Sequence, residues 1–144
     1  YLQKTLSTHM EFDLDLAKEQ SAKNPVYYVQ YACARMSSIL NKSSVSSRQL
    51  SVKKLEIIKN KPVRNLVLKL IQFPEIIEDT AKDYQVHRLT TYAYELANEF
   101  SQFYRDVKVI DSENEKELVA LVAQTRKILA DTLGLLGISA PDKM

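Results

Sequence analysis

The sequence predicts an all-α fold, a helical bundle of about five to seven helices. Only two of its 144 residues are glycine, and both, Gly134 and Gly137, lie near the end of the sequence. Apolar residues recur at helical spacing, and almost no stretch shows the alternation of apolar and polar residues that is typical of a half-buried strand. The length suits one domain that buries most of its apolar surface.

A strong helix start lies at residues 24 and 25. Asn24 is of a type that caps the free N–H groups of a helix, and Pro25 suits the first helical position. We expect a helix from Pro25 to about Asn41, preceded by a short helix over residues 12–22. At 100° per residue, its core stripe gathers within about 60° of one direction: Val29, Ala32, Cys33, Met36 and Leu40.

Further helices are predicted along the rest of the chain. A serine-rich loop over residues 42–51 leads to helices over 50–59 and 62–70, and Pro74 starts the next one. Ser112 and Glu115 have the spacing of a capping box at the start of a final helix, which Gly137 ends with a positive φ. Between these, a long helix over 86–104 has a wide apolar stripe: Val86, Leu89, Ala93, Leu96, Ala97, Phe100 and Tyr104.

Charge is distributed unevenly, although the net charge of +2 is too small to demand a nucleic-acid partner. Eight basic residues and one acid lie between Lys42 and Lys69, whereas eleven acids and five bases lie between Glu75 and Glu117. The basic segment can attract a phosphate backbone by releasing counterions. The alternative is an ordinary solvated surface of helix and loop.

Side chains for catalysis or metal binding are scarce. His9 and His87 are the only histidines, and neither has a second nitrogen or thiol at metal-ligand spacing. The sequence has no glycine-rich phosphate loop, and Asp13 and Asp15 fall on different helical faces, which favours capping or solvated roles. We therefore predict a binding module with no catalytic residue and no metal site.

The single cysteine, Cys33, cannot form an internal disulfide and is expected to lie in the core, which fits a reducing cytoplasm. No apolar run approaches the ~18 residues of a membrane span, so no membrane partner is expected. The sequence opens at Tyr1 without a starting methionine, which suggests a piece of a larger protein.

Three polar or aromatic side chains gather on the helix that begins at Pro25. Tyr28, Tyr31 and Arg35 fall together at roughly 200–260° from Val29, off the core stripe. Aromatic rings beside a guanidinium form a surface on which unpaired bases can stack. The alternative for the tyrosines is packing with only the hydroxyl exposed.

The run Asn24-Pro25-Val26-Tyr27-Tyr28-Val29-Gln30-Tyr31-Ala32-Cys33-Ala34-Arg35 resembles a signature of arginyl-tRNA synthetases, at the entrance to their C-terminal anticodon-binding (DALR-type) domain. Further blocks resemble this family in the same order. They are Phe12-Asp13-Leu14-Asp15-Leu16-Ala17, Phe73-Pro74-Glu75, Thr91-Tyr92-Ala93-Tyr94-Glu95-Leu96-Ala97, and Leu135 to Met144. Cys33 departs from the family, which usually has histidine there.

The resemblance implies a cytoplasmic parent enzyme of class I that joins arginine to its tRNA using ATP with Mg. Both ATP-handling motifs of that family are absent here, so no cofactor is expected in this chain. Residues 1–22 would connect to a missing catalytic domain, and residues 23–144 would form the helical anticodon-binding domain. The expected partner is the anticodon loop of an arginine-accepting tRNA.

We expect tRNA contacts on the helix from Pro25, in the long helix and at the end of the sequence: Tyr28, Tyr31, Gln30, Arg35, Arg88, Tyr92 and Met144. The resemblance implies Tyr28, Tyr31, Arg35, Tyr92 and Met144, while helical spacing places Arg88 one turn from Tyr92. Arg35 can alternatively hold a carboxylate of a neighbouring helix.

Two other functions remain open. One is the helical anticodon domain of another class I synthetase. The other is a helical protein-interaction module, in which the tyrosines would be docking anchors.

Overall fold

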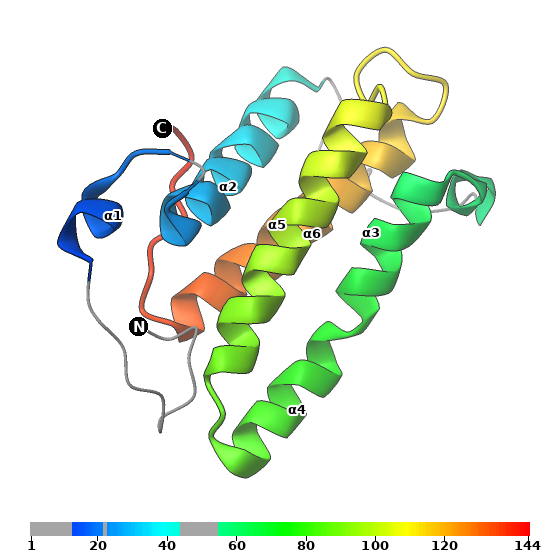
Figure 1. Ribbon diagram of the computed structural model, residues 1–144. Helices are drawn as coiled ribbons and strands as arrows, with labels where there is room; N and C mark the ends of the chain where they lie inside the picture. Colours follow the sequence, from blue (N-terminus) through cyan, green and yellow to red (C-terminus); the bar gives the residue numbers. More distant parts are fainter. Residues whose placement is uncertain (1–12, 22, 44–54) are drawn as a thin grey trace.

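The computed structural model describes residues 13–21, 23–43 and 55–144, and its regular elements in these ranges are all helical (Figure 1). They are α1 (Leu14–Lys18), α2 (Pro25–Lys42), the 3₁₀ helix η2 (Leu55–Lys59), α3 (Lys61–Ile71), α4 (Phe73–Asp83), α5 (His87–Asp106) and α6 (Glu115–Leu135). The predicted all-α class is confirmed. Beyond Ser43, the predicted serine-rich loop lies outside the described residues, as does the start of the helix expected over 50–59.

Helix α5 is the centre of the bundle and contacts α2, α3, α4 and α6 (Figure 1). The predicted core stripe of α2 is buried at Val29, Ala32, Cys33 and Met36, and Leu40 packs partly buried against the same core. From α5 and α6, the largest fully buried side chains include Tyr92, Phe100, Phe103, Leu129 and Leu133. None of the helices in the described ranges has the length and apolar character needed to cross a membrane.

Asn24 begins α2 as its side chain predicts. Its Oδ1 accepts from the N–H groups of Val26, at 3.1 Å, and Tyr27, at 3.4 Å. Its Nδ2 donates to the backbone carbonyls of Ala17 and Glu19, both at 3.1 Å. One side chain therefore caps α2 and ties it to the segment around α1.

Gly137 ends α6 with φ +70°, as expected from its position. The N–H of Ile138 donates to the carbonyl of Leu133 at 2.9 Å, and that of Gly137 to the carbonyl of Gly134 at 3.0 Å. This pair of bonds is the Schellman motif, which satisfies carbonyls that the last turn leaves unpaired. The chain turns there and continues as the segment 138–144.

The capping box predicted at Ser112 is wrong in detail. Ser112 Oγ donates to the carbonyl of Val109 at 2.8 Å, and no side-chain cap bond forms at the residue before the helix, Asn114. The Glu115 carboxylate does reach backwards, but it accepts from the N–H of Asp111, at 2.9 Å, and from Ser43 Oγ, at 3.1 Å. Glu115 thus joins the turn before α6 to the end of α2.

Candidate nucleic-acid interface

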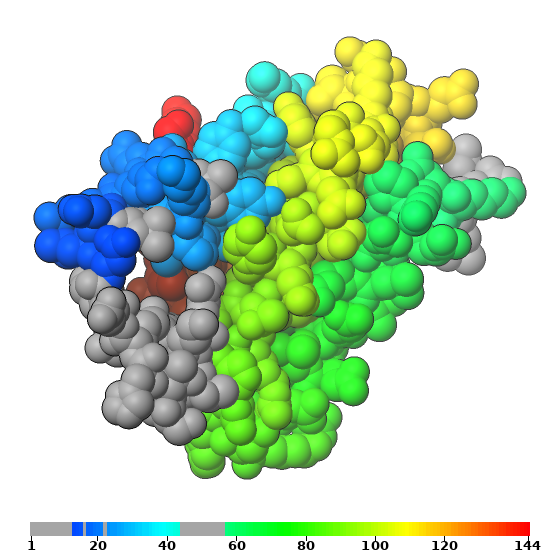
Figure 2. Space-filling model, viewed as in Figure 1, coloured from blue at the N-terminus to red at the C-terminus, as the bar shows by residue number. Residues whose placement is uncertain are grey.

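An aromatic cluster lies where α2 meets the second half of α5, and the two helices form one continuous surface in the space-filling view (Figure 2). Tyr31 is 42% exposed, and its ring stacks on that of Tyr27 with 6.5 Å between centroids and 13° between planes. The guanidinium carbon of Arg35 lies 4.8 Å from the ring centroid of Tyr31 and 4.6 Å from that of Tyr104. We call Tyr27, Tyr31, Arg35 and Tyr104 the aromatic cluster.

Arg35 orients the cluster. Its Nη2 donates to Tyr31 Oη at 2.6 Å while the guanidinium carbon lies over both the Tyr31 and the Tyr104 ring. Each cation–π contact contributes about 0.5–1 kcal/mol at an exposed site. The Arg35 charge and the Tyr31 face are therefore fixed next to each other, as the helical spacing predicts.

Tyr28 borders the aromatic cluster in a more enclosed position. Its hydroxyl donates to Ser101 Oγ of α5 at 3.1 Å, and its ring lies 5.2 Å from that of Tyr94, centroid to centroid. Ser101 Oγ in turn donates to the carbonyl of Ala97 at 2.9 Å. Tyr28 is half-buried and joins α2 to α5, while Tyr31 presents a more open ring.

Gln30 of α2 contacts the segment 138–144, which carries Met144. Gln30 Nε2 donates to the carbonyl of Ser139 at 2.9 Å and to its Oγ at 3.2 Å. Met144 is 54% exposed. The structure therefore brings the segment 138–144 to the same helix that carries Tyr31.

Tyr92 does not lie at the surface, and this part of the prediction is wrong. The residue is 1% exposed, its ring lies 5.8 Å from Phe73, and its hydroxyl donates to the carbonyl of Lys69 at 3.1 Å. Burial raises the pKa of the Tyr92 hydroxyl above its usual range. The reason is that α3 and α4 both pack on this side of α5, so the buried face of α5 is wider than its apolar stripe.

Arg88 is also separate from the aromatic cluster. Its Nη2 lies 2.7 Å from Asp83 Oδ2 at the α4–α5 turn, and this bond holds the pKa of the Asp83 carboxyl below its usual range. Arg88 and Tyr104 are sixteen positions apart on α5, which corresponds to about 24 Å along the helix axis. The predicted pairing of Arg88 with Tyr92 on one RNA-facing surface is not found.

The basic segment is described only in part. Lys59, Lys61 and Arg64 are exposed. Lys69 forms an ion pair with Glu95. The remaining bases of this segment between residues 44 and 54 lie outside the described residues.

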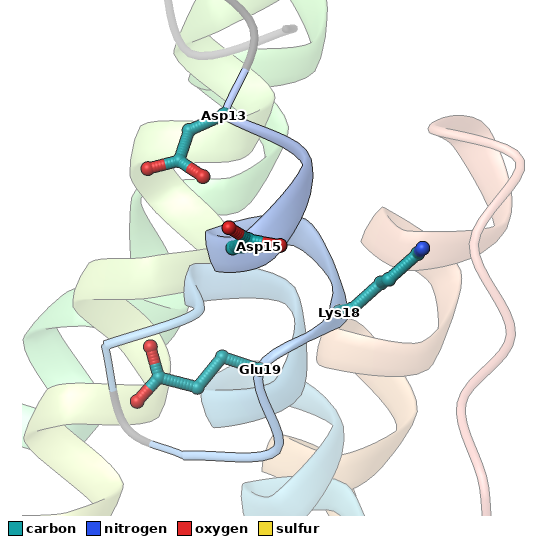
Figure 3. Close-up of a pocket in the computed structure, with 4 residues that line it drawn as sticks. All are labelled: Asp13, Asp15, Lys18 and Glu19. Atoms are coloured by element: carbon teal, nitrogen blue, oxygen red, sulfur yellow. The ribbon is translucent and has the colours of Figure 1, made fainter.

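An open hollow at α1 is lined by Asp13, Asp15, Lys18 and Glu19 (Figure 3). Lys18 and Glu19 point away from one another there, and Asp13 and Asp15 do not converge on a shared point (Figure 3). Within the described ranges, no group of three or more His, Cys, Asp or Glu side chains could hold a metal ion. The geometry gives this hollow no catalytic arrangement.

Tyr27 and Tyr104 are the two residues of the cluster that the sequence pattern does not single out, and Tyr104 is the one that the pattern assigns elsewhere. Helical periodicity assigns it to the core stripe of the long helix, yet it is 42% exposed and packs on Arg35 and on Phe100, 6.2 Å away between ring centroids. Val86, at the other end of that stripe, is exposed as well. The signal that could have found Tyr104 is its place at the end of the stripe, where a tyrosine can bury one edge and expose its hydroxyl.

Comparison with known proteins relates the chain to one family. The family described as the DALR anticodon binding domain matches residues 29–144. An arginine–tRNA ligase of Dehalococcoides mccartyi is 40% identical over 146 residues, which cover 100% of this chain and 26% of that protein. The chain thus spans about a quarter of the length of the curated relatives it matches.

Solved structures agree with this relationship. The arginyl-tRNA synthetase of Plasmodium falciparum superposes with a TM-score of 0.77 and 28% identity, over 99% of this chain and 25% of that chain. The arginyl-tRNA synthetase of Thermus thermophilus gives a TM-score of 0.71 and 30% identity, over 89% of this chain and 22% of that chain.

Proposed function

We propose, since the chain belongs to the DALR anticodon-binding domain family, that its aromatic cluster binds the anticodon loop of an arginine-accepting tRNA. The observation that carries the proposal is the guanidinium of Arg35 lying over the exposed rings of both Tyr31 and Tyr104. Anticodon bases are unpaired, and proteins recognise unpaired bases by stacking and by hydrogen bonds to their edges.

Stacking supplies the affinity in this proposal. A base that stacks on Tyr31 or Tyr104 contributes on the order of 1–3 kcal/mol. The Arg35 charge lies beside these rings, where it attracts the phosphate that accompanies a stacked base. Tyr28 supports the surface by joining α2 to α5 through Ser101.

Gln30 and Met144 are assigned to the side of the site formed by the segment 138–144. Arg88 and Tyr92 are left out, because the first is paired with Asp83 away from the cluster and the second is buried. Tyr27 and Tyr104 are added, because their rings stack on Tyr31 and on Arg35.

The whole protein in this proposal is a cytoplasmic arginine–tRNA ligase. Its relatives bear that name, and this chain spans about a quarter of their length. ATP with Mg and the aminoacylation chemistry would belong to a catalytic domain outside this chain. Residues 1–22 would connect to that domain, and residues 23–144 would form the RNA-binding unit.

A fluorescence-anisotropy titration tests the proposal. The full chain is titrated with a labelled anticodon stem-loop of an arginine tRNA and with the same stem-loop carrying a scrambled anticodon. We expect tighter binding of the native loop, with affinity that falls as salt rises. Equal affinity for both loops would contradict anticodon recognition and leave only electrostatic attraction.

Two variants test whether the aromatic cluster recognises the anticodon. Tyr31→Ala should weaken anticodon-dependent recognition of the native loop while the helical content stays intact. Tyr84→Asn is the matched control, because Tyr84 is 78% exposed at the α4–α5 turn and asparagine tolerates its positive φ of 58°. If both variants keep the preference, the tyrosines serve as protein docking anchors instead.

A further inference from the structure

The segment 138–144 lies against the bundle over several residues. The turn at Gly137 directs it back along α2, and Ile138 and Ala140 pack against the hydrophobic core. Ser139 accepts both hydrogen bonds from Gln30. This part of the chain is therefore docked by apolar and polar contacts together.

A cluster of polar side chains binds the segment 138–144 near its last residues. Ser37 Oγ of α2 donates to Asp142 Oδ1 at 2.9 Å, and Arg126 of α6 donates to both, through Nε to Ser37 Oγ and through Nη2 to Asp142 Oδ1. Ser37 is only 4% exposed. Three separate parts of the chain thus meet at one carboxylate, which we call the Asp142 latch.

The latch and the aromatic cluster flank the same strip of α2. Gln30 and Ser37 are seven residues apart and point in nearly one direction, whereas Tyr31 and Arg35 lie about 100–140° around the helix from Gln30. Between the two sides runs the outward strip that carries Ala34 and Ser38. An RNA strand on this strip has the aromatic rings on one side and the segment 138–144 on the other.

We propose that the Asp142 latch positions the segment 138–144 as the second wall of the RNA site, so that docking of the segment and binding of the anticodon loop are thermodynamically coupled. This inference rests on the proposed function. Coupling is reciprocal: if the docked segment raises the affinity for RNA, bound RNA must stabilise the docked segment by the same factor. Ser37, Arg126 and Asp142 are positioning residues in this scheme, since they act through the segment they hold.

Cys33 offers a direct measure of docking. It is the single cysteine of the chain and is fully buried next to the latch, where the charges of Arg126 and Asp142 reach its sulfur. Burial raises the pKa of the Cys33 thiol to about 11, so the thiol is unreactive in the docked state. The negative charge of Asp142 raises this pKa as well, so the readout of docking is the change that native RNA makes to the Cys33 reaction rate in the wild-type chain, where this charge is kept.

The experiment compares three forms of the full chain with wild type. Asp142→Asn removes the negative charge and so weakens the latch, and the double variant Arg126→Asp with Asp142→Arg restores an ion pair in the opposite sense. Glu78→Gln is the matched control, because it removes a carboxylate whose Oε1 lies 2.8 Å from Lys82 Nζ on α4, away from the segment. Helical content is checked by circular dichroism for each form.

We expect Asp142→Asn to weaken binding of the native stem-loop by at least about fivefold, the lower end of usual coupling factors, with little effect on the scrambled loop. Cys33 should react faster in this variant, and native RNA should slow the reaction in wild type. The double variant should recover part of both effects, and Glu78→Gln should show neither.

Two results would overturn the inference. One is faster reaction of Cys33 in Asp142→Asn with the preference for the native loop unchanged. The other is a wild-type Cys33 rate that native RNA does not change, because docking of the segment and binding of RNA would then not be coupled. A wild-type chain that binds both loops equally would instead refute the proposed function, so the two failures are distinguishable.

Discussion

The buried position of Tyr92 leads to the sharpest prediction. Its hydroxyl donates to the carbonyl of Lys69, which belongs to the last four residues of α3. Carbonyls in the last four positions of a helix have no partner within the helix, so Tyr92 supplies one of the missing bonds. Tyr92→Phe removes this bond and keeps the ring against Phe73.

The magnitude follows from that geometry. A neutral hydrogen bond contributes a net 0.5–1.5 kcal/mol, and leaving a partly buried carbonyl unpaired adds to the loss, so we expect about 1–2 kcal/mol less stability. For a domain of this size the melting temperature should fall by about 3–8 °C. Thermal unfolding followed by circular dichroism measures it, with Tyr84→Phe as the exposed control.

RNA binding should not change in Tyr92→Phe, because this hydroxyl points toward α3 and away from the aromatic cluster. The titration with the native and scrambled stem-loops provides that comparison. If Tyr92→Phe instead keeps the melting temperature and loses the preference for the native loop, the hydrogen bond to Lys69 does not stabilise the fold. Tyr92 would then be a residue of the RNA site.

Three further outcomes are expected. Arg35→Lys keeps the charge but not the planar contact with two rings, so native-loop binding should weaken by about 1 kcal/mol while its salt dependence, measured by anisotropy, stays the same. Gly137→Ala should cost about 1–2 kcal/mol in thermal unfolding, because its φ is +70° although nothing lies within 4 Å of an added Cβ. The hydrogen bond from Ser37 and the charge of Arg126 lower the pKa of Asp142, so the latch stabilises the fold above the unfolded-state pKa and this stability is lost as pH falls through the folded-state pKa. In Asp142→Asn, the free energy of unfolding should therefore depend less on pH in this acidic range, as measured by unfolding at a series of pH values.

Local signals explain why α2 could be predicted closely. Asn24 and Pro25 mark its start through chemistry that needs no partner helix, and the core stripe follows from the helical period. The neighbours Tyr31 and Arg35 are one turn apart on the same helix, so their contact is also a local property.

Contacts between helices limit what the sequence can predict. The position of Tyr92 depends on how α3 and α4 close over α5, and that of Tyr104 on how far α2 extends beside it. A helical wheel gives the direction of a side chain but not the width of the surface that a neighbour covers. The Asp142 latch joins α2, α6 and the segment beyond α6, so no local pattern could reveal it.

The side chain of Asn24 connects the start of α2 to the segment around α1. Its amide accepts two hydrogen bonds at the start of α2 and donates two to the backbone near α1. Aspartate could make the same cap but has no hydrogens to donate, and serine has only one, so neither could engage both sides in this way. These four hydrogen bonds link the segment 13–21 directly to the first turn of α2. Replacing Asn24 by aspartate or serine would therefore keep a cap on α2 but lose at least one of the hydrogen bonds to the segment 13–21.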